Sequence, residues 1–222
     1  MGGVLLNIKK ILPSLLTFAN LSIGFIVLLL ISNGEYRHAL SLIIIAMVLD
    51  GLDGKLARKL QVSGDFGKEL DSLCDIASFG LVPAFYTWHM NEAGLFYEII
   101  MVLALIFFII CGAYRLARFN VETSTKGFAG LPITIAGGLL ALVSYYAVML
   151  NTLILIIFTI FLALLMISDI SYSSFKGSHI QFRSYWWYLI PVLITFLFIL
   201  LPYTFLIVLI VYLFSGIANE IL

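Results

Sequence analysis

The sequence predicts an all-α integral membrane protein with eight transmembrane helices, and three observations support this fold class. Hydrophobic residues make up 63% of the 222 residues and charged residues only 11%, with a mean hydropathy of +1.14, whereas soluble domains carry about 25% charged residues. Long apolar stretches recur along the chain and are separated by Gly, Asn, Ser and Pro positions, which interrupt helices. In the resulting topology, lysine and arginine gather on one side of the membrane.

The apolar stretches have the length that a membrane requires. A helix needs about 20 mostly apolar residues to cross the hydrocarbon core. The breaks at Asn151 and Pro202 are short, so the helices on either side of each are expected to form antiparallel hairpins. The eight predicted spans are residues 13–32, 38–59, 69–90, 96–118, 131–150, 152–170, 186–201 and 203–219.

The distribution of positive charge predicts the orientation. Eight spans place both termini on one side, and eleven of the twelve lysine and arginine residues then fall on that side. Only Arg37 falls on the other. Because cytoplasmic loops are enriched in positive charge, we expect a multi-pass protein of the cytoplasmic membrane with both termini inside. The eleven residues are Lys9, Lys10, Lys55, Arg58, Lys59, Lys68, Arg115, Arg118, Lys126, Lys176 and Arg183.

The first twelve residues have an amphipathic pattern. Apolar residues share one helical face, and Asn7, Lys9 and Lys10 lie opposite. This predicts a short helix over residues 1–12 on the inner membrane surface. The net charge of zero gives no indication of a nucleic-acid partner. The apolar residues of this face are Val4, Leu5, Ile8, Ile11 and Leu12.

Four aspartates lie on either side of the turn between the second and third spans. Asp50 and Asp53 are spaced i, i+3 and share a helical face with Ala57, while Asp71 and Asp75 are spaced i, i+4. The connection is short, so we expect the two helices to be antiparallel neighbours with their aspartates facing each other. The predicted site therefore lies at the cytoplasmic surface.

Carboxylates that cluster in an apolar chain carry two costs, the burial of their charge and their mutual repulsion, and something must offset both. A carboxylate at the bilayer centre costs about 2.5–3.5 kcal/mol, and four together repel one another. Divalent cations would offset this, because hard cations prefer carboxylate oxygens. Two such ions suit metal-assisted phosphoryl transfer, and an aspartate can accept a proton from an attacking hydroxyl. The alternative is a solvated helix end with ordinary surface acids, but Gly54 among the acids favours close approach of a ligand.

The segment also resembles a known family signature. It reads Asp50-x-x-Asp53-Gly54-x-x-Ala57-Arg58, then eight residues, then Gly67-x-x-x-Asp71-x-x-x-Asp75. This pattern is similar to that of the CDP-alcohol phosphotransferases, which transfer a phosphatidyl-type group from a CDP-activated lipid to an alcohol and release CMP. The resemblance implies a six-helix core over residues 13–170, two additional helices over 186–219, a homodimer, and two Mg²⁺ or Mn²⁺ ions in each site.

The resemblance also implies roles for individual residues. The four aspartates would hold metal, and Asp75 would also act as the general base. A Thr-x-x-Asn pattern at Thr17 and Asn20 resembles one near the nucleotide site, although Asn20 can alternatively bond a neighbouring helix. The residues implied to bind the CDP-lipid are Gly54, Ala57, Arg58, Gly67, Thr17 and Asn20, with Gly67 allowing close helix approach.

Three further motifs bear on the acceptor alcohol. They begin at Ser78, Tyr114 and Phe128, and they resemble the phosphatidylserine synthase branch of the family. Arg115 and Arg118 share a face near the cytoplasmic end of the fourth span, where they and Ser78 are expected to bind the acceptor, with an arginine pairing the carboxylate of L-serine. The alternative is that both arginines only follow the bias of positive charge, but arginine inside a span is costly unless paired.

Other functions remain open at this stage. The nearest alternative is a transferase of the same family with glycerol phosphate or inositol phosphate as acceptor, which would favour a denser basic pocket. An intramembrane prenyltransferase would need a second Asp-rich motif, and beyond Glu122 the only acidic residues are Asp169 and Glu220. A divalent-cation transporter would place its acids near the bilayer midplane.

Overall fold

The structure is a computed structural model that describes residues 2–60, 64–91, 93–121, 128–146, 151–172 and 209–213. Within these residues the protein is helical apart from one short antiparallel pair of strands, β1 (Phe128–Ala129) and β2 (Ser171–Tyr172). Residues 209–213 are also helical. The helices are α1 (Gly2–Ser32), α2 (Tyr36–Leu60), α3 (Asp65–Asp75), the π-helix η1 (Ile76–Leu81), α4 (Val82–Met90), α5 (Leu95–Val121), α6 (Ile133–Tyr146) and α7 (Thr152–Ile167).

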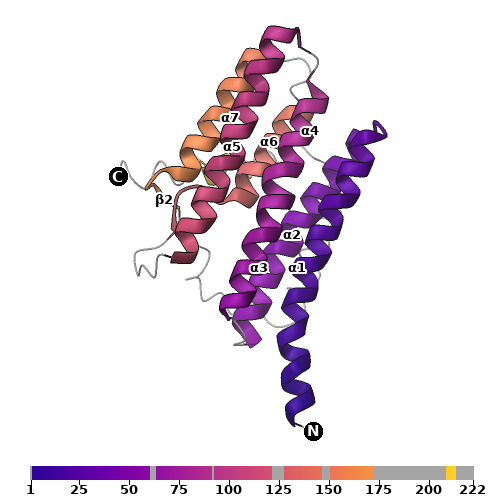
Figure 1. Ribbon diagram of the computed structural model, residues 1–222, viewed down its shortest axis with the longest axis vertical. Helices are drawn as coiled ribbons and strands as arrows, with labels where there is room; N and C mark the ends of the chain where they lie inside the picture. The colour runs from indigo at the N-terminus through magenta and orange to yellow at the C-terminus, as the bar shows by residue number, and fades with distance from the viewer. Residues whose placement is uncertain are drawn as a thin grey trace.

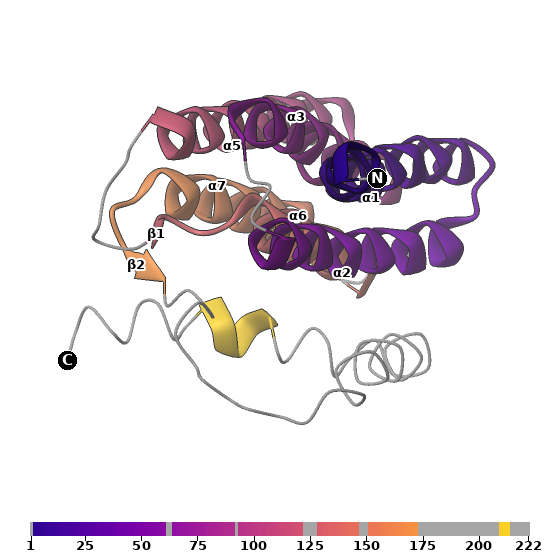
Figure 2. The same cartoon turned by 90° about the horizontal axis from the view of Figure 1, so that it is seen from below.

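The helices are arranged in two rows along the long axis of the molecule (Figure 1). Figure 2 shows α1, α3 and α5 in one row and α2, α6 and α7 in the other, with residues 209–213 on the outer side of the second row. The shared core between the rows is apolar, with Phe79, Phe108 and Leu139 among its fully buried side chains. This arrangement places the end of α2 and the start of α3 at the same end of the molecule.

Two helices are long and apolar enough to cross a membrane, Ser14–Ser32 within α1 and the whole of α5, Leu95–Val121. The helices α6 and α7 are shorter and also apolar. Large apolar side chains point outward along α1 and α5, where lipid rather than water is the natural surrounding of such a surface. They include Leu15, Phe18, Phe25, Leu29, Leu95, Ile99, Leu103, Ile106 and Ile110.

The helix boundaries agree with the first six predicted spans. The predicted seventh and eighth spans lie outside the described residues except for 209–213, so the number of eight stays a prediction.

The prediction of a separate helix over residues 1–12 is wrong, because α1 runs without interruption from Gly2 to Ser32. Residues 8–19 contain no glycine or asparagine to end a helix, and the single hydrogen bond lost at Pro13 does not stop it. That these first residues lie on the membrane surface stays a prediction.

The third predicted span is one continuous helical run with a π-helical turn directly after Asp75. Pro83 has no N–H to donate to the carbonyl of Phe79, and its ring would crowd that carbonyl in a regular α-helix. A wider π turn relieves this crowding. A side chain at Gly137 of α6 would overlap the Phe79 carbonyl oxygen. This glycine therefore lets α6 approach the π turn closely.

The start of α6 is fixed to the end of α7. Gly130 N–H donates to Ile170 O at 2.9 Å, and Leu131 N–H donates to Leu165 O at 3.0 Å. The strand pair beside it matches Phe128 with Tyr172. Gly130 has φ of +80°, and an added Cβ would overlap the Met166 carbonyl oxygen. Only glycine fits both the backbone conformation and this close approach.

Candidate active site

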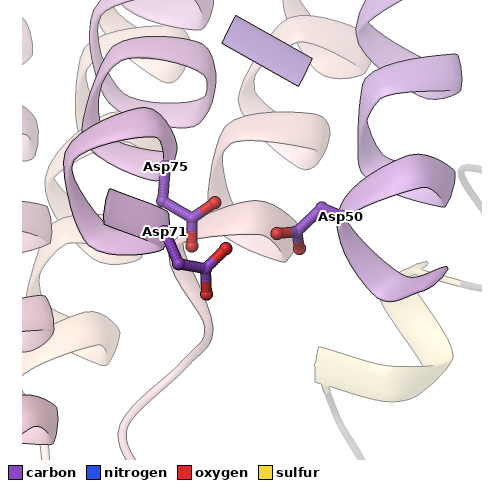
Figure 3. Close-up of side chains that lie close together, drawn as sticks. All are labelled: Asp50, Asp71 and Asp75. Carbon is purple, nitrogen blue, oxygen red and sulfur yellow. The ribbon is translucent and has the colours of Figure 1, made fainter. Parts of the chain in front are cut away.

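Three of the four predicted aspartates meet between the two rows of helices (Figure 3). Asp50 projects from α2, and Asp71 and Asp75 project toward it from α3. One carboxylate oxygen of each lies within 4.8 Å of the others. Asp75 is buried, with 8% of its surface exposed, and the other two are half-buried. The juxtaposition that helical spacing predicts is therefore confirmed for these three residues.

The two helices that carry the aspartates are both packed against α1. The main contacts of α3 are with α1, η1 and α5, and those of α2 are with α1 and α6. The prediction that the aspartates of these two helices face each other is confirmed for Asp50, Asp71 and Asp75, and α1 lies against both helices.

Two hydrogen bonds from other helices hold this region together. Thr134, in the first turn of α6, donates from Oγ1 to Oδ2 of Asp50 at 3.1 Å. Asn120, near the end of α5, donates from Nδ2 to Oγ of Ser72 at 3.0 Å. Sequence reasoning missed both, since neither Thr134 nor Asn120 is near the aspartates in the chain.

The two arginines of α5 have different surroundings. Arg115 is buried, with 6% of its surface exposed, and its charge acts on Asp75 and Asp50. Its Nε has no hydrogen-bond partner within the described residues. A buried guanidinium with an unused donor is unusual. It is suited to a ligand beside the aspartates.

Arg118 lies one turn further along α5 and holds the end of α7. Its Nη1 donates to Oδ1 of Asp169 at 3.1 Å and to Ile167 O at 3.4 Å, and its Nη2 donates to Ser168 O at 3.1 Å. A positive charge is stabilising at the C-terminal end of a helix, because the last carbonyls there lack intrahelical partners. The prediction that Arg118 binds the acceptor stays a prediction, with much of its guanidinium already engaged.

The segment 209–213 brings a further residue to the site. Tyr212 is half-buried and lies within electrostatic range of Arg115. Leu209 and Leu213 of the same segment are buried in the core. Sequence reasoning treated this stretch only as part of an additional span, since nothing near Tyr212 resembles a motif.

The helix α1 presents buried polar groups to the π turn. Thr17 is buried, and Asn20 has only 1% of its surface exposed. Neither Oδ1 nor Nδ2 of Asn20 has a hydrogen-bond partner among the residues described. Ser78 is also buried, and its Oγ donates to the Asn20 carbonyl at 3.4 Å. The amide of Asn20 is therefore available to a ligand, whereas Ser78 faces the backbone of α1.

The remaining predicted residues lie near the end of α2 and the start of α3. Asp53, Ala57 and Arg58 belong to α2, but their side chains lie outside the described part of the chain. Gly54 is half-buried. An added Cβ at Gly67 would meet nothing within 4 Å among the described residues, and the close helix approach expected there stays a prediction. Residues 64–69 are all exposed, so the first turn of α3 extends beyond its neighbours.

The clustered residues fit a divalent cation. All the donors are carboxylate oxygens, which are the ligands that Mg²⁺ and Mn²⁺ prefer. Three of them converge from two helices within 4.8 Å, so one ion can bind them together. Without an ion, three carboxylates at this separation in a partly buried site would repel one another.

The comparison with protein families identifies the family to which this chain belongs. The model of the CDP-alcohol phosphatidyltransferase family matches residues 10–167, a range that includes α2 to α7 and all four aspartates. The chain belongs to this family, as its aspartate signature predicts. The family is embedded in membranes, which agrees with the long apolar helices.

Individual relatives are named for serine as the acceptor. The chain is 38% identical over 173 residues to the CDP-diacylglycerol–serine O-phosphatidyltransferase of Methanocaldococcus jannaschii, covering 77% of this chain and 79% of the relative. It is 36% identical over 185 residues to the archaetidylserine synthase of Methanothermobacter thermautotrophicus, covering 78% and 76%. It is 34% identical over 166 residues to the CDP-diacylglycerol–serine O-phosphatidyltransferase of Bacillus subtilis, covering 74% of this chain and 91% of the relative.

Proposed function

We propose that this protein transfers a phosphatidyl-type group from a CDP-activated lipid to the hydroxyl of L-serine and releases CMP. The observation that carries the proposal is the convergence of Asp50, Asp71 and Asp75 within 4.8 Å beside the buried Arg115. The family assignment gives the reaction type, and the names of the relatives favour serine. Membership of this family also argues against the prenyltransferase and transporter alternatives.

The aspartates perform two tasks in the proposed reaction. Asp50, Asp53, Asp71 and Asp75 would hold two divalent cations, Mg²⁺ or Mn²⁺, which would neutralise charge on the diphosphate and on the leaving oxygen. Asp75 accepts the proton of the serine hydroxyl. The hydroxyl oxygen forms a bond to the lipid-side phosphorus, and the bond from that phosphorus to the bridging oxygen breaks. CMP leaves with the electron pair.

The CDP-lipid is proposed to lie beside the aspartates, with contacts from α1 and α2. Gly54, Ala57 and Arg58 of α2 would face the cytidine and the phosphates, with the Arg58 charge on the diphosphate. From α1, Thr17 and Asn20 would approach the same ligand. The support for Asn20 is its buried amide, which has no hydrogen-bond partner in the described structure. A nucleotide would supply the missing donors and acceptors.

The acceptor is proposed to bind at Arg115. A serine carboxylate beside its guanidinium would bring the hydroxyl toward Asp75, on which the Arg115 charge acts. Ser78 and Arg118 were predicted for the same subsite, and we propose that they border it. A phosphorylated acceptor would favour several free cationic groups, whereas much of the Arg118 guanidinium is engaged by the end of α7.

Replacing Arg115 tests the acceptor subsite. Arg115→Lys is expected to raise the KM for serine roughly 10–100-fold, because a charge-assisted hydrogen bond is worth about 1.5–3 kcal/mol, while the KM for the CDP-lipid stays within a few-fold. Initial rates of CMP release over a range of serine concentrations measure this. Arg37→Lys is the matched control, because Arg37 is exposed at the start of α2, away from the aspartates, and its KM for serine should be unchanged. A KM for serine that Arg115→Lys leaves unchanged would contradict the assignment.

The whole proposal is tested by comparing acceptors. Purified protein is incubated with CDP-diacylglycerol or CDP-archaeol and Mg²⁺ or Mn²⁺, and CMP release is measured with serine, glycerol phosphate and inositol phosphate in parallel. We expect release that depends on both serine and metal. Strong release with another acceptor and none with serine would overturn the serine assignment while keeping the family reaction.

The proposed setting is the cytoplasmic membrane, with eight spans, both termini inside, and a homodimer as the resemblance implies. The aspartates, Arg115 and Arg118 lie toward the end of the molecule where α2 ends and α3 begins, and Arg37 lies at the start of α2, toward the opposite end. This asymmetry supports a site open to the cytoplasm, where CDP-lipid in the inner leaflet and soluble serine can meet.

A further inference from the structure

Asp50 is the member of the cluster whose position depends most on other elements. Asp71 and Asp75 are spaced i, i+4 on α3, so one helix sets their relative position. Asp50 comes from α2 and points across the space between the helices (Figure 3). Rotation of its side chain about χ1 would move its oxygens away from the other two. Convergence therefore requires something that holds the Asp50 carboxylate.

Thr134 is placed to hold it. Its Oγ1 donates to Oδ2 of Asp50 at 3.1 Å, over a separation of 84 residues in the chain. A carboxylate has about four acceptor sites, so one donated hydrogen bond leaves the others for a cation. Thr134 can donate without adding charge, and it lies outside the set of clustered carboxylates.

Thr134 is itself firmly positioned. It is the second residue of α6, which begins at Ile133. The residues just before it are bonded to the end of α7 through Gly130 N–H and Leu131 N–H. Arg118 then joins that same end of α7 to α5. A continuous set of hydrogen bonds therefore fixes the first turn of α6 relative to both α5 and α7.

We infer that Thr134 is a positioning residue for the metal centre, whose hydroxyl orients Asp50 so that three carboxylates converge on one cation. The inference rests on the proposed metal-binding role of the aspartates and is independent of which alcohol is the acceptor. Groups that orient ligands in this way commonly change metal affinity 10–100-fold when they are removed. Thr134 touches neither the substrates nor the reacting atoms in the proposed reaction.

Two substitutions separate the hydroxyl from the shape of the side chain. Thr134→Val removes the hydroxyl and keeps the volume, and Thr134→Ser keeps the hydroxyl. Binding of Mn²⁺ to the purified protein without substrate is measured from the free-Mn²⁺ signal in electron paramagnetic resonance. We expect Thr134→Val to weaken Mn²⁺ binding roughly 10–100-fold, and Thr134→Ser to retain near-normal binding. CMP release by Thr134→Val should recover at high Mn²⁺, with the KM for serine unchanged.

Thr152→Val is the matched control. Thr152, the first residue of α7, is also half-buried, and its hydroxyl also donates over 3.1 Å, to Oδ1 of Asn91 at the end of α4. This variant should lose stability with unchanged Mn²⁺ affinity. If Thr134→Val behaves in the same way while the unsubstituted protein binds Mn²⁺ normally, the positioning role is wrong. If the unsubstituted protein binds no Mn²⁺, the metal assignment fails and the positioning role with it, a result distinct from a failure of the serine assignment alone.

Discussion

Asp71→Asn is expected to lower serine-dependent CMP release by roughly a thousandfold or more. The amide keeps the size of the side chain but removes one of three negative charges that converge within 4.8 Å. A metal-bound transition state gains several kcal/mol from its ion, and about 4 kcal/mol corresponds to three orders of magnitude in rate. CMP release at saturating CDP-lipid and serine measures the loss, and Mn²⁺ binding should weaken in parallel.

Glu69→Gln is the matched control for this variant. Glu69 lies two residues earlier on α3, is exposed, and does not belong to the carboxylate cluster. Its substitution also removes one negative charge from the same helix, and the rate should stay within about twofold because exposed charges are well screened. Full activity of folded Asp71→Asn would show that this carboxylate does not hold the metal.

The carboxylate cluster was predictable because its pattern is local. Helical periodicity relates Asp71 to Asp75 directly, and a short connection brings them near Asp50. The same reasoning did not predict that α1 lies against both α2 and α3. Spacing along one helix shows which residues share a face, but it does not show that α1 covers both helices.

The supporting residues were not predictable for a related reason. Thr134 reaches Asp50 across 84 residues, and this contact depends on how α6 is attached to α7. Arg115 and Arg118 share a helical face, so the sequence alone gave them one role. Their surroundings separate them, because Arg118 lies beside the end of α7 and donates to its last carbonyls, whereas the charge of Arg115 acts on Asp75 and Asp50.

Gly130→Ala is expected to produce the largest loss of stability among the glycine substitutions considered. At φ of +80°, a side chain costs roughly 1–2 kcal/mol, and its Cβ would also overlap the Met166 carbonyl oxygen. Backbone atoms cannot rotate away, so α6 must move relative to α7. The hydrogen bonds from Gly130 and Leu131 would weaken, bringing the expected total to roughly 3–5 kcal/mol. Thermal unfolding in detergent, followed by circular dichroism, measures the change.

Gly34→Ala is the control that separates the cost of the overlap with Met166 from the cost of the backbone conformation. Gly34 has nearly the same φ, +78°, but an added Cβ would meet nothing within 4 Å, so only the backbone cost of roughly 1–2 kcal/mol applies. Equal losses in the two variants would mean that the contact with Met166 does not constrain α6. A second difference should accompany the first, because Gly130 lies shortly before Thr134 and Gly34 lies in the turn between α1 and α2. Displacing the start of α6 should weaken Mn²⁺ binding in Gly130→Ala, whereas Gly34→Ala should bind Mn²⁺ normally.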